Sequence, residues 1–83
     1  MTDDLNILAV HQAVNWLNLH QEQVLKLPAF RHLERWHTVM FGYDPDLKFW
    51  GYCIWFDEMR RTSWAVKTGP QLLELYQEAK LLA

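Results

Sequence analysis

Nine consecutive residues, from Lys48 to Phe56, carry five aromatic side chains and no acidic one, and this run constrains the fold more than any other segment. A chain of 83 residues has a small interior, because a domain of this size buries only about 60–65% of the surface that its unfolded form exposes. We therefore expect one domain over residues 1–83, with some rings in its core and some facing a partner.

The aromatic run favours a β-strand, because aromatic residues are enriched in strands and alternate side chains point to opposite faces. One face would carry Trp50, Tyr52, Ile54 and Phe56, and the other would carry Phe49, Cys53 and Trp55. Residues 62–68 suit a second strand, and residues 57–60 would form the hairpin loop. Both faces of the first strand are apolar, so helices that cover one face would leave the other free for a partner.

A helix over the same segment is the alternative. Asp44 could cap it and Pro45 could occupy its first turn. Its apolar stripe would be Tyr52, Trp55, Phe56, Met59, Thr62 and Val66. No Gly, Pro or Asn lies between Tyr52 and Lys67, although a tight hairpin would favour one there. We favour the hairpin, and both interpretations stay open at the level of the sequence.

Helices are predicted on both sides of this segment. The first would be capped by Thr2, Asp3 or Asp4 and would end near Leu25, ahead of Pro28. Its apolar stripe would be Ile7, Val10, Val14, Leu17 and Val24, and its solvent side would be His11, Gln12, Asn15, Asn18, Glu22 and Gln23.

A second helix would begin at Pro28 and end at Phe41, closed by Gly42. The last helix would open at Pro70, after Thr68 or Gly69. The predicted fold class is α+β, with three helices packed on an aromatic β-hairpin in the order α-α-β-β-α. The alternative is an all-α four-helix domain in which residues 45–67 are helical.

The charge balance argues against a strong nucleic-acid binder, because eight Lys and Arg face ten Asp and Glu. The start of the chain lacks the basic region of a secretory signal, and its apolar stretches are shorter than the roughly 20 residues of a membrane helix. The single cysteine, Cys53, excludes a disulfide within the chain. These features predict a cytoplasmic location.

No residue pattern indicates a metal, a cofactor or a catalytic site. His32 and His37 are five residues apart, whereas a zinc-protease helix requires a spacing of four. We expect His37 to be half-buried with a hydrogen bond, and Cys53 to be a buried, unreactive thiol. A small enzyme with an unrecognised site, using His37 or Glu58, is the last alternative.

The surplus of ring surface predicts a small non-enzymatic protein–protein interaction module, acting as a regulator or inhibitor and forming a homodimer. The expected partner-binding residues are Trp50, Trp55, Arg60, Arg61 and Trp64. The alternative is a small nucleic-acid-binding module that requires Arg31, Arg35, Arg60 and Arg61 to converge on one face with Trp64.

Overall fold

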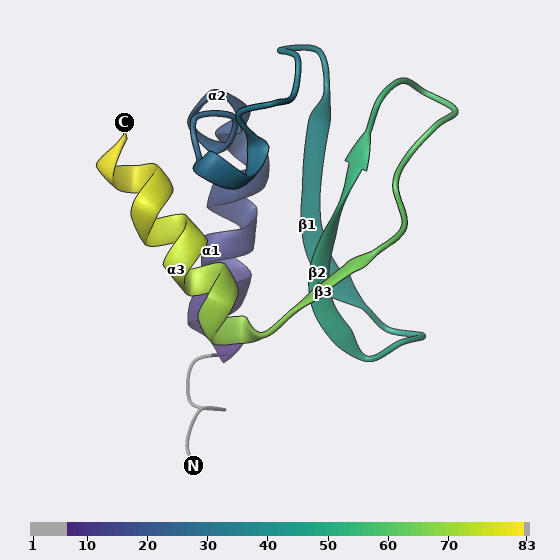
Figure 1. Ribbon diagram of the computed structural model, residues 1–83. Helices are drawn as coiled ribbons and strands as arrows, with labels where there is room; N and C mark the ends of the chain where they lie inside the picture. Colours follow the sequence, from purple (N-terminus) through teal and green to yellow (C-terminus); the bar gives the residue numbers. More distant parts are fainter. Residues whose placement is uncertain (1–6, 83) are drawn as a thin grey trace.

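The computed structural model describes residues 7–82 of the chain (Figure 1). Its elements are α1 (Ile7–Leu19), α2 (Gln21–Val24), the 3-10 turn η2 (Pro28–Phe30), β1 (Thr38–Asp44), β2 (Phe49–Trp55), β3 (Ala65–Lys67) and α3 (Gly69–Leu81). The three strands form one antiparallel sheet in the order β1-β2-β3. The predicted α+β class and the aromatic hairpin are confirmed, and the all-α alternative over residues 45–67 is wrong. The order is α-α-β-β-β-α and not the predicted α-α-β-β-α, because β1 adds a third strand to the hairpin of β2 and β3.

The prediction of a helix from Pro28 to Phe41 is wrong. Only Pro28–Phe30 is helical there, as a single 3-10 turn, and residues 38–44 form β1. All seven residues of β1 pair with β2, from Thr38 opposite Trp55 to Asp44 opposite Phe49. The long aromatic strand β2 therefore has β1 on one edge and β3 on the other. Pairing with β2 outweighs the weak helical pattern of residues 38–41.

The first predicted helix is divided in two at His20. The amide of His20 donates to the carbonyl of Leu17, and the His20 ring stacks on Trp16 with a centroid distance of 3.9 Å. The cap predicted at residues 2–4 lies outside the described residues. Within residues 7–82, none of the helices is both long and apolar enough to cross a lipid bilayer.

The last helix begins as predicted. The Thr68 hydroxyl accepts a hydrogen bond from the Gln71 amide (3.2 Å), and the Gln71 side chain accepts one from the Thr68 amide (2.8 Å). This capping box satisfies two amides that a helix start would otherwise leave without partners. Pro70 lies in the first turn, where its missing N–H costs nothing.

The helices α1, α2 and α3 lie on one side of the sheet (Figure 1). The core fills the space between these two layers, where α1 packs against both α3 and β1. Its largest fully buried side chains are Phe30, Leu17, Leu27, Leu72, Val24 and Val39. Trp50, Tyr52 and Ile54 pack on this cluster from β2, so the first predicted strand face is the one that faces the helices.

The free edge of β1 is closed by two side-chain amides from the helical layer. Asn18 donates to the carbonyl of Phe41 (3.0 Å) and accepts from its amide (2.8 Å). Gln21 does the same with Val39, at 2.8 and 2.9 Å. Asn18 is thus half-buried, not on the solvent side as predicted. The two amides reproduce the hydrogen bonds of a neighbouring strand at Val39 and Phe41, which protects this part of the edge from pairing with another chain.

A four-residue loop joins β1 to β2. The Asp44 carboxylate accepts hydrogen bonds from the amides of Asp46 (2.9 Å) and Leu47 (3.2 Å), and the Lys48 amide donates to the Asp44 carbonyl (2.7 Å). Lys48 adopts a positive φ of 62°, which places its side chain at the end of the sheet beside Phe49.

Candidate functional site

The sheet face away from the helices is the main candidate surface, and we call it the outer face. It is formed by alternate residues of the strands, together with the indole of Trp64 just before β3: Met40, Gly42, Phe49, Gly51, Cys53, Trp55, Trp64 and Val66. Within the described part of the chain, no helix covers it. Phe49 is 52% exposed and Met40 is 43% exposed, so the apolar surface of this face reaches solvent.

A shallow groove of about 440 Å³ lies at the end of the outer face where β2 stops. Its walls are Trp36, Thr38, Met40, Trp55, Asp57 and Glu58. Trp36 comes from the connection between η2 and β1, and its side chain is 69% exposed. The Trp36 ring lies edge-on to His37, and the His37 ring lies edge-on to Phe56. These contacts connect the loop that carries Trp36 to the end of β2.

Trp55 is held by the segment that returns from the loop after β2. The Arg61 guanidinium lies 5.6 Å from the centre of the Trp55 ring, within the range of a cation–π interaction. Next to it, the Ile54 amide donates to the Thr62 hydroxyl and the Thr62 amide donates to the Ile54 carbonyl, both at 2.9 Å. The groove wall at Trp55 is therefore fixed before any partner arrives.

The acidic rim of the groove is also ordered. One oxygen of Asp57 accepts hydrogen bonds from the amides of Met59 (2.7 Å) and Arg60 (2.9 Å), and the other accepts from the Arg60 side chain (2.7 Å). The Met59 amide, followed by the Arg60 side chain, holds the pKa of Asp57 below its ordinary value. Asp57 is charged at neutral pH, and Glu58 beside it also lines the groove.

Trp64 covers the middle of the outer face because two glycines lie opposite each other beneath it. A Cβ on Gly51 would lie 2.7 Å from the indole nitrogen of Trp64 and 2.2 Å from the carbonyl oxygen of Ala65. On Gly42, the neighbour of Gly51 in β1, a Cβ would lie 3.9 Å from the same ring. The indole nitrogen is buried and has no hydrogen-bond partner among residues 7–82.

Cys53 is buried on this face, as predicted. Burial raises the pKa of its thiol above the ordinary value, against the opposing effects of Arg61 and Trp55. A thiol with a raised pKa is a poor nucleophile at neutral pH. The side chain therefore serves the packing of the face.

The structure brings together three of the five residues predicted to bind a partner. Trp55, Arg61 and Trp64 lie on or beside the outer face. Trp50 instead faces the helices, where its ring contacts those of His11 and Tyr43. Arg60 pairs with Asp57 within the loop after β2.

Sequence reasoning missed Trp36 and Met40, which form the other side of the groove. Met40 falls within residues 28–41, where the sequence predicts a helix and the structure places β1 instead. Strand alternation from Val39, which is buried, to Met40, which is half-exposed, is the signal that could have placed it.

The residues of the other hypotheses are dispersed. Arg31 lines a groove with Lys26 and the end of α3, in the helical layer. Arg61 lies on the opposite side of the sheet, against Trp55. His37 is half-buried as predicted, and its Nδ1 accepts a hydrogen bond from the Glu34 amide (3.0 Å).

Among residues 7–82, no cluster of three or more His, Cys, Asp or Glu is arranged to hold a metal ion. Comparison of the chain with protein-family models, with curated protein sequences and with solved structures gives no match.

Proposed function

We propose that this protein is a small non-enzymatic protein–protein interaction module that docks through the outer face of its sheet and acts as a regulator or inhibitor in the cytoplasm. The observation that carries the proposal is the exposed groove between Trp36, Met40 and Trp55 on an apolar sheet face. Tryptophan and methionine are enriched in protein interfaces because they bury a large area on contact.

The state of the groove supports binding rather than chemistry. One of its two carboxylates is engaged in the local turn: Asp57 accepts hydrogen bonds from the amides of Met59 and Arg60 and pairs with the Arg60 side chain. Fixed walls reduce the entropy lost on association, because fewer side chains have to be ordered by the partner. A flat, open surface with such walls suits a protein partner better than an enclosed small substrate.

Nucleic-acid binding is the weaker hypothesis. A stacking platform requires cations along one groove together with exposed rings. Here Arg31 and Arg61 lie on opposite sides of the sheet, and the formal net charge of the chain is −2. We expect its affinity for single-stranded DNA to be weak and to depend little on salt, because few cations can contact phosphates at the same time.

Site-specific photo-crosslinking tests the proposal in cells. A benzophenone amino acid replaces Met40 on the outer face, and in a matched control it replaces Leu8, which is exposed on α1. We expect protein adducts from position 40 and none from position 8. Trp36→Ala, which removes one wall of the groove, should abolish the adducts at position 40. Equal labelling from both positions, or no protein adduct at position 40, contradicts the proposal.

A further inference from the structure

A cleft lies between the two layers of the molecule, on the side of the sheet opposite the outer face. Lys67 ends β3, and the next residue, Thr68, already caps α3. The strand and the helix diverge from this point (Figure 1). Because α3 packs mainly against α1 and not against the strands, a cleft of about 180 Å³ stays open between them. The capping box at Thr68 and Gln71 holds its two walls at their junction, so the cleft is preformed.

The inner wall of the cleft is apolar. The rings of Phe30 and Tyr52 meet there edge to face, with centroids 5.1 Å apart. Ala29 and Leu75 complete this wall. An apolar wall with a few polar groups around it is the usual composition of a small-molecule site, and such pockets measure roughly 300–1,000 Å³ for drug-sized ligands. This cleft is smaller, so it suits a smaller ligand.

The polar groups of the cleft follow a fixed order along α3. Lys67 and Gln71 lie at the start of the helix, and Glu74 lies further along it. The cap uses the side-chain oxygen of Gln71, which leaves its NH2 group for a ligand. Gln71 and Glu74 are three residues apart, which is about 4.5 Å along the helix axis. Donors at one end and a carboxylate at the other are therefore within reach of one small molecule.

The charges that face the cleft are of both signs. Lys67 is the cation among the residues that line it, and Glu74 and Glu78 are the carboxylates. Glu78 also borders the neighbouring groove, together with Lys26 and Arg31, so its charge is offset there. Among residues 7–82, no ion pair joins Lys67 to either carboxylate. Lys67 and Glu74 are thus left to face a ligand that carries both charges.

We propose that this cleft binds a free α-amino acid with an apolar side chain. The ligand carboxylate accepts hydrogen bonds from Lys67 and Gln71, at the positive end of the α3 dipole. The ligand ammonium group donates to Glu74, and the ligand side chain packs on Tyr52 and Leu75. The inference goes beyond the function proposed above and is independent of it, because it uses the other side of the sheet.

Three probes of nearly the same shape test which charges are recognised. L-leucine carries both charges, isopentylamine carries the ammonium group alone, and isocaproate carries the carboxylate alone. Each is titrated to about 20 mM into the full chain at neutral pH and constant ionic strength, so that screening is equal. We expect leucine to give saturable NMR shifts at the amides of Gln71, Glu74 and Leu75, with a Kd of about 1 mM. Each single-charge probe should bind at least about 10-fold more weakly.

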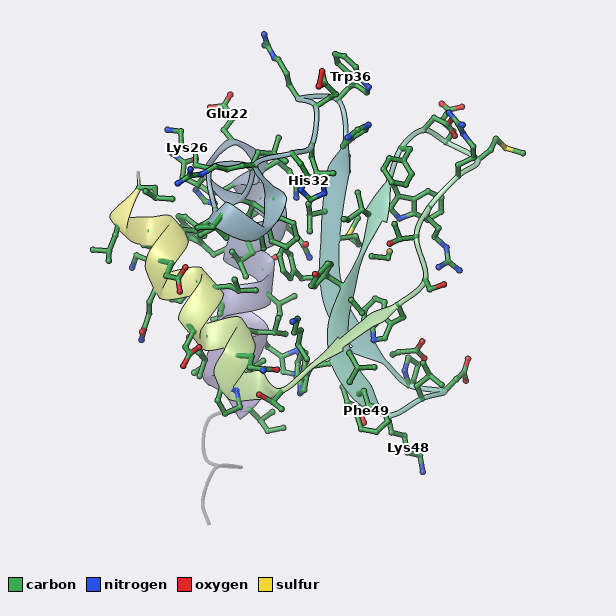
Figure 2. All side chains as sticks on the ribbon, in the orientation of Figure 1. Glu22, Lys26, His32, Trp36, Lys48 and Phe49 are labelled. Carbon is green, nitrogen blue, oxygen red and sulfur yellow. The ribbon has the colours of Figure 1, made fainter. Side chains whose placement is uncertain are left out.

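Two substitutions remove the charges of the cleft one at a time. Glu74→Gln keeps the shape of the side chain and loses the carboxylate, and Lys67→Met loses the ammonium group. Each should weaken leucine binding about 10-fold. The matched controls are Glu22→Gln and Arg35→Met, which remove the same charges at exposed positions outside the cleft. Figure 2 shows Glu22 on α2, pointing away from the start of α3. Both controls should bind leucine as the native chain does, and all four variants should keep its circular dichroism spectrum.

Saturable binding of leucine that both cleft variants weaken and neither control changes supports the proposal. Absence of saturable shifts up to the highest leucine concentration overturns it. Equal binding of leucine and either single-charge probe also overturns it, as does leucine binding that Glu74→Gln and Lys67→Met leave intact. Each outcome is separate from the photo-crosslinking test, because neither Glu74 nor Lys67 lies on the outer face.

Discussion

The amide of Gln21 offers the most direct test of how this fold is held. It donates to the Val39 carbonyl at 2.8 Å and accepts from the Val39 amide at 2.9 Å. Gln21→Ala leaves both backbone groups without these partners. An unsatisfied donor or acceptor costs about 1–3 kcal/mol when it stays buried. Because water can reach part of this edge, we expect a total loss of about 2 kcal/mol.

That loss is large for a chain of 83 residues, whose free energy of unfolding should be roughly 4–12 kcal/mol. The assay is urea unfolding followed by tryptophan fluorescence, which gives the free energy of unfolding at a fixed pH. The matched control is Gln12→Glu or Gln12→Ala on the exposed side of α1, for which we expect a change within about 0.5 kcal/mol.

Gln21→Glu makes the prediction sharper, because it preserves the shape of the side chain. The carboxylate can still accept from the Val39 amide, but its other oxygen faces the Val39 carbonyl and repels it. The folded state therefore raises the pKa of this Glu above the ordinary value of about 4.3. The stabilising contribution is fully present below the unfolded pKa and is lost as pH rises through the folded pKa.

We expect Gln21→Glu to cost about 2 kcal/mol relative to the native chain at pH 7, and clearly less at pH 4. The comparison uses the difference between variant and native chain at each pH, so that other titrating groups cancel. An equal penalty at both pH values, or no penalty in either Gln21 variant, would refute the view that this amide replaces a neighbouring strand.

Three further predictions concern the site and its support. Gly51→Ala should destabilise the protein by about 3 kcal/mol or displace Trp64, because the new Cβ would lie 2.2 Å from a backbone oxygen. In Gly42→Ala the nearest contact of the new Cβ is at 3.9 Å, so stability should change by less than about 1 kcal/mol. Urea unfolding measures the free energy of unfolding of both variants. Thr68→Ala removes the cap of α3 and should cost about 1 kcal/mol in the same assay. The pKa of the Asp57 carboxyl should lie below 3.8 in an NMR titration. Because folding lowers this pKa, the contribution of Asp57 to the order of the loop is present at neutral pH. That contribution is lost as pH falls through the lowered pKa.

Local chemistry was sufficient to predict several elements from the sequence. The capping box at Thr68 and Gln71 and the proline after Gly69 define the start of α3 by contacts within one turn. The aromatic composition and alternation of residues 49–55 predict a strand, which the structure contains. The burial of Cys53 also follows from its immediate neighbours. His37 is half-buried as predicted, but through its ring contact with Phe56 and not on the helix that the prediction assumed.

The candidate site was only partly predictable. Trp55, Arg61 and Trp64 were named from the sequence, since they belong to or flank the aromatic hairpin. Trp36 and Met40 were missed, because the segment before β2 has an apolar spacing that fits a helix as well as a strand. Their role depends on the pairing of β1 with β2, a contact between residues that are distant along the chain.

The sequence by itself determined that this chain would contain a two-faced aromatic strand and a capped last helix, because alternation and capping depend on residues that are near one another along the chain. Only the tertiary structure decided which face of that strand the helices cover. The choice depends on how Val39 and Phe41 pack in the core and how Asn18 and Gln21 bind the edge of β1. Those contacts cross 18 and 23 residues of sequence, and no local pattern records them.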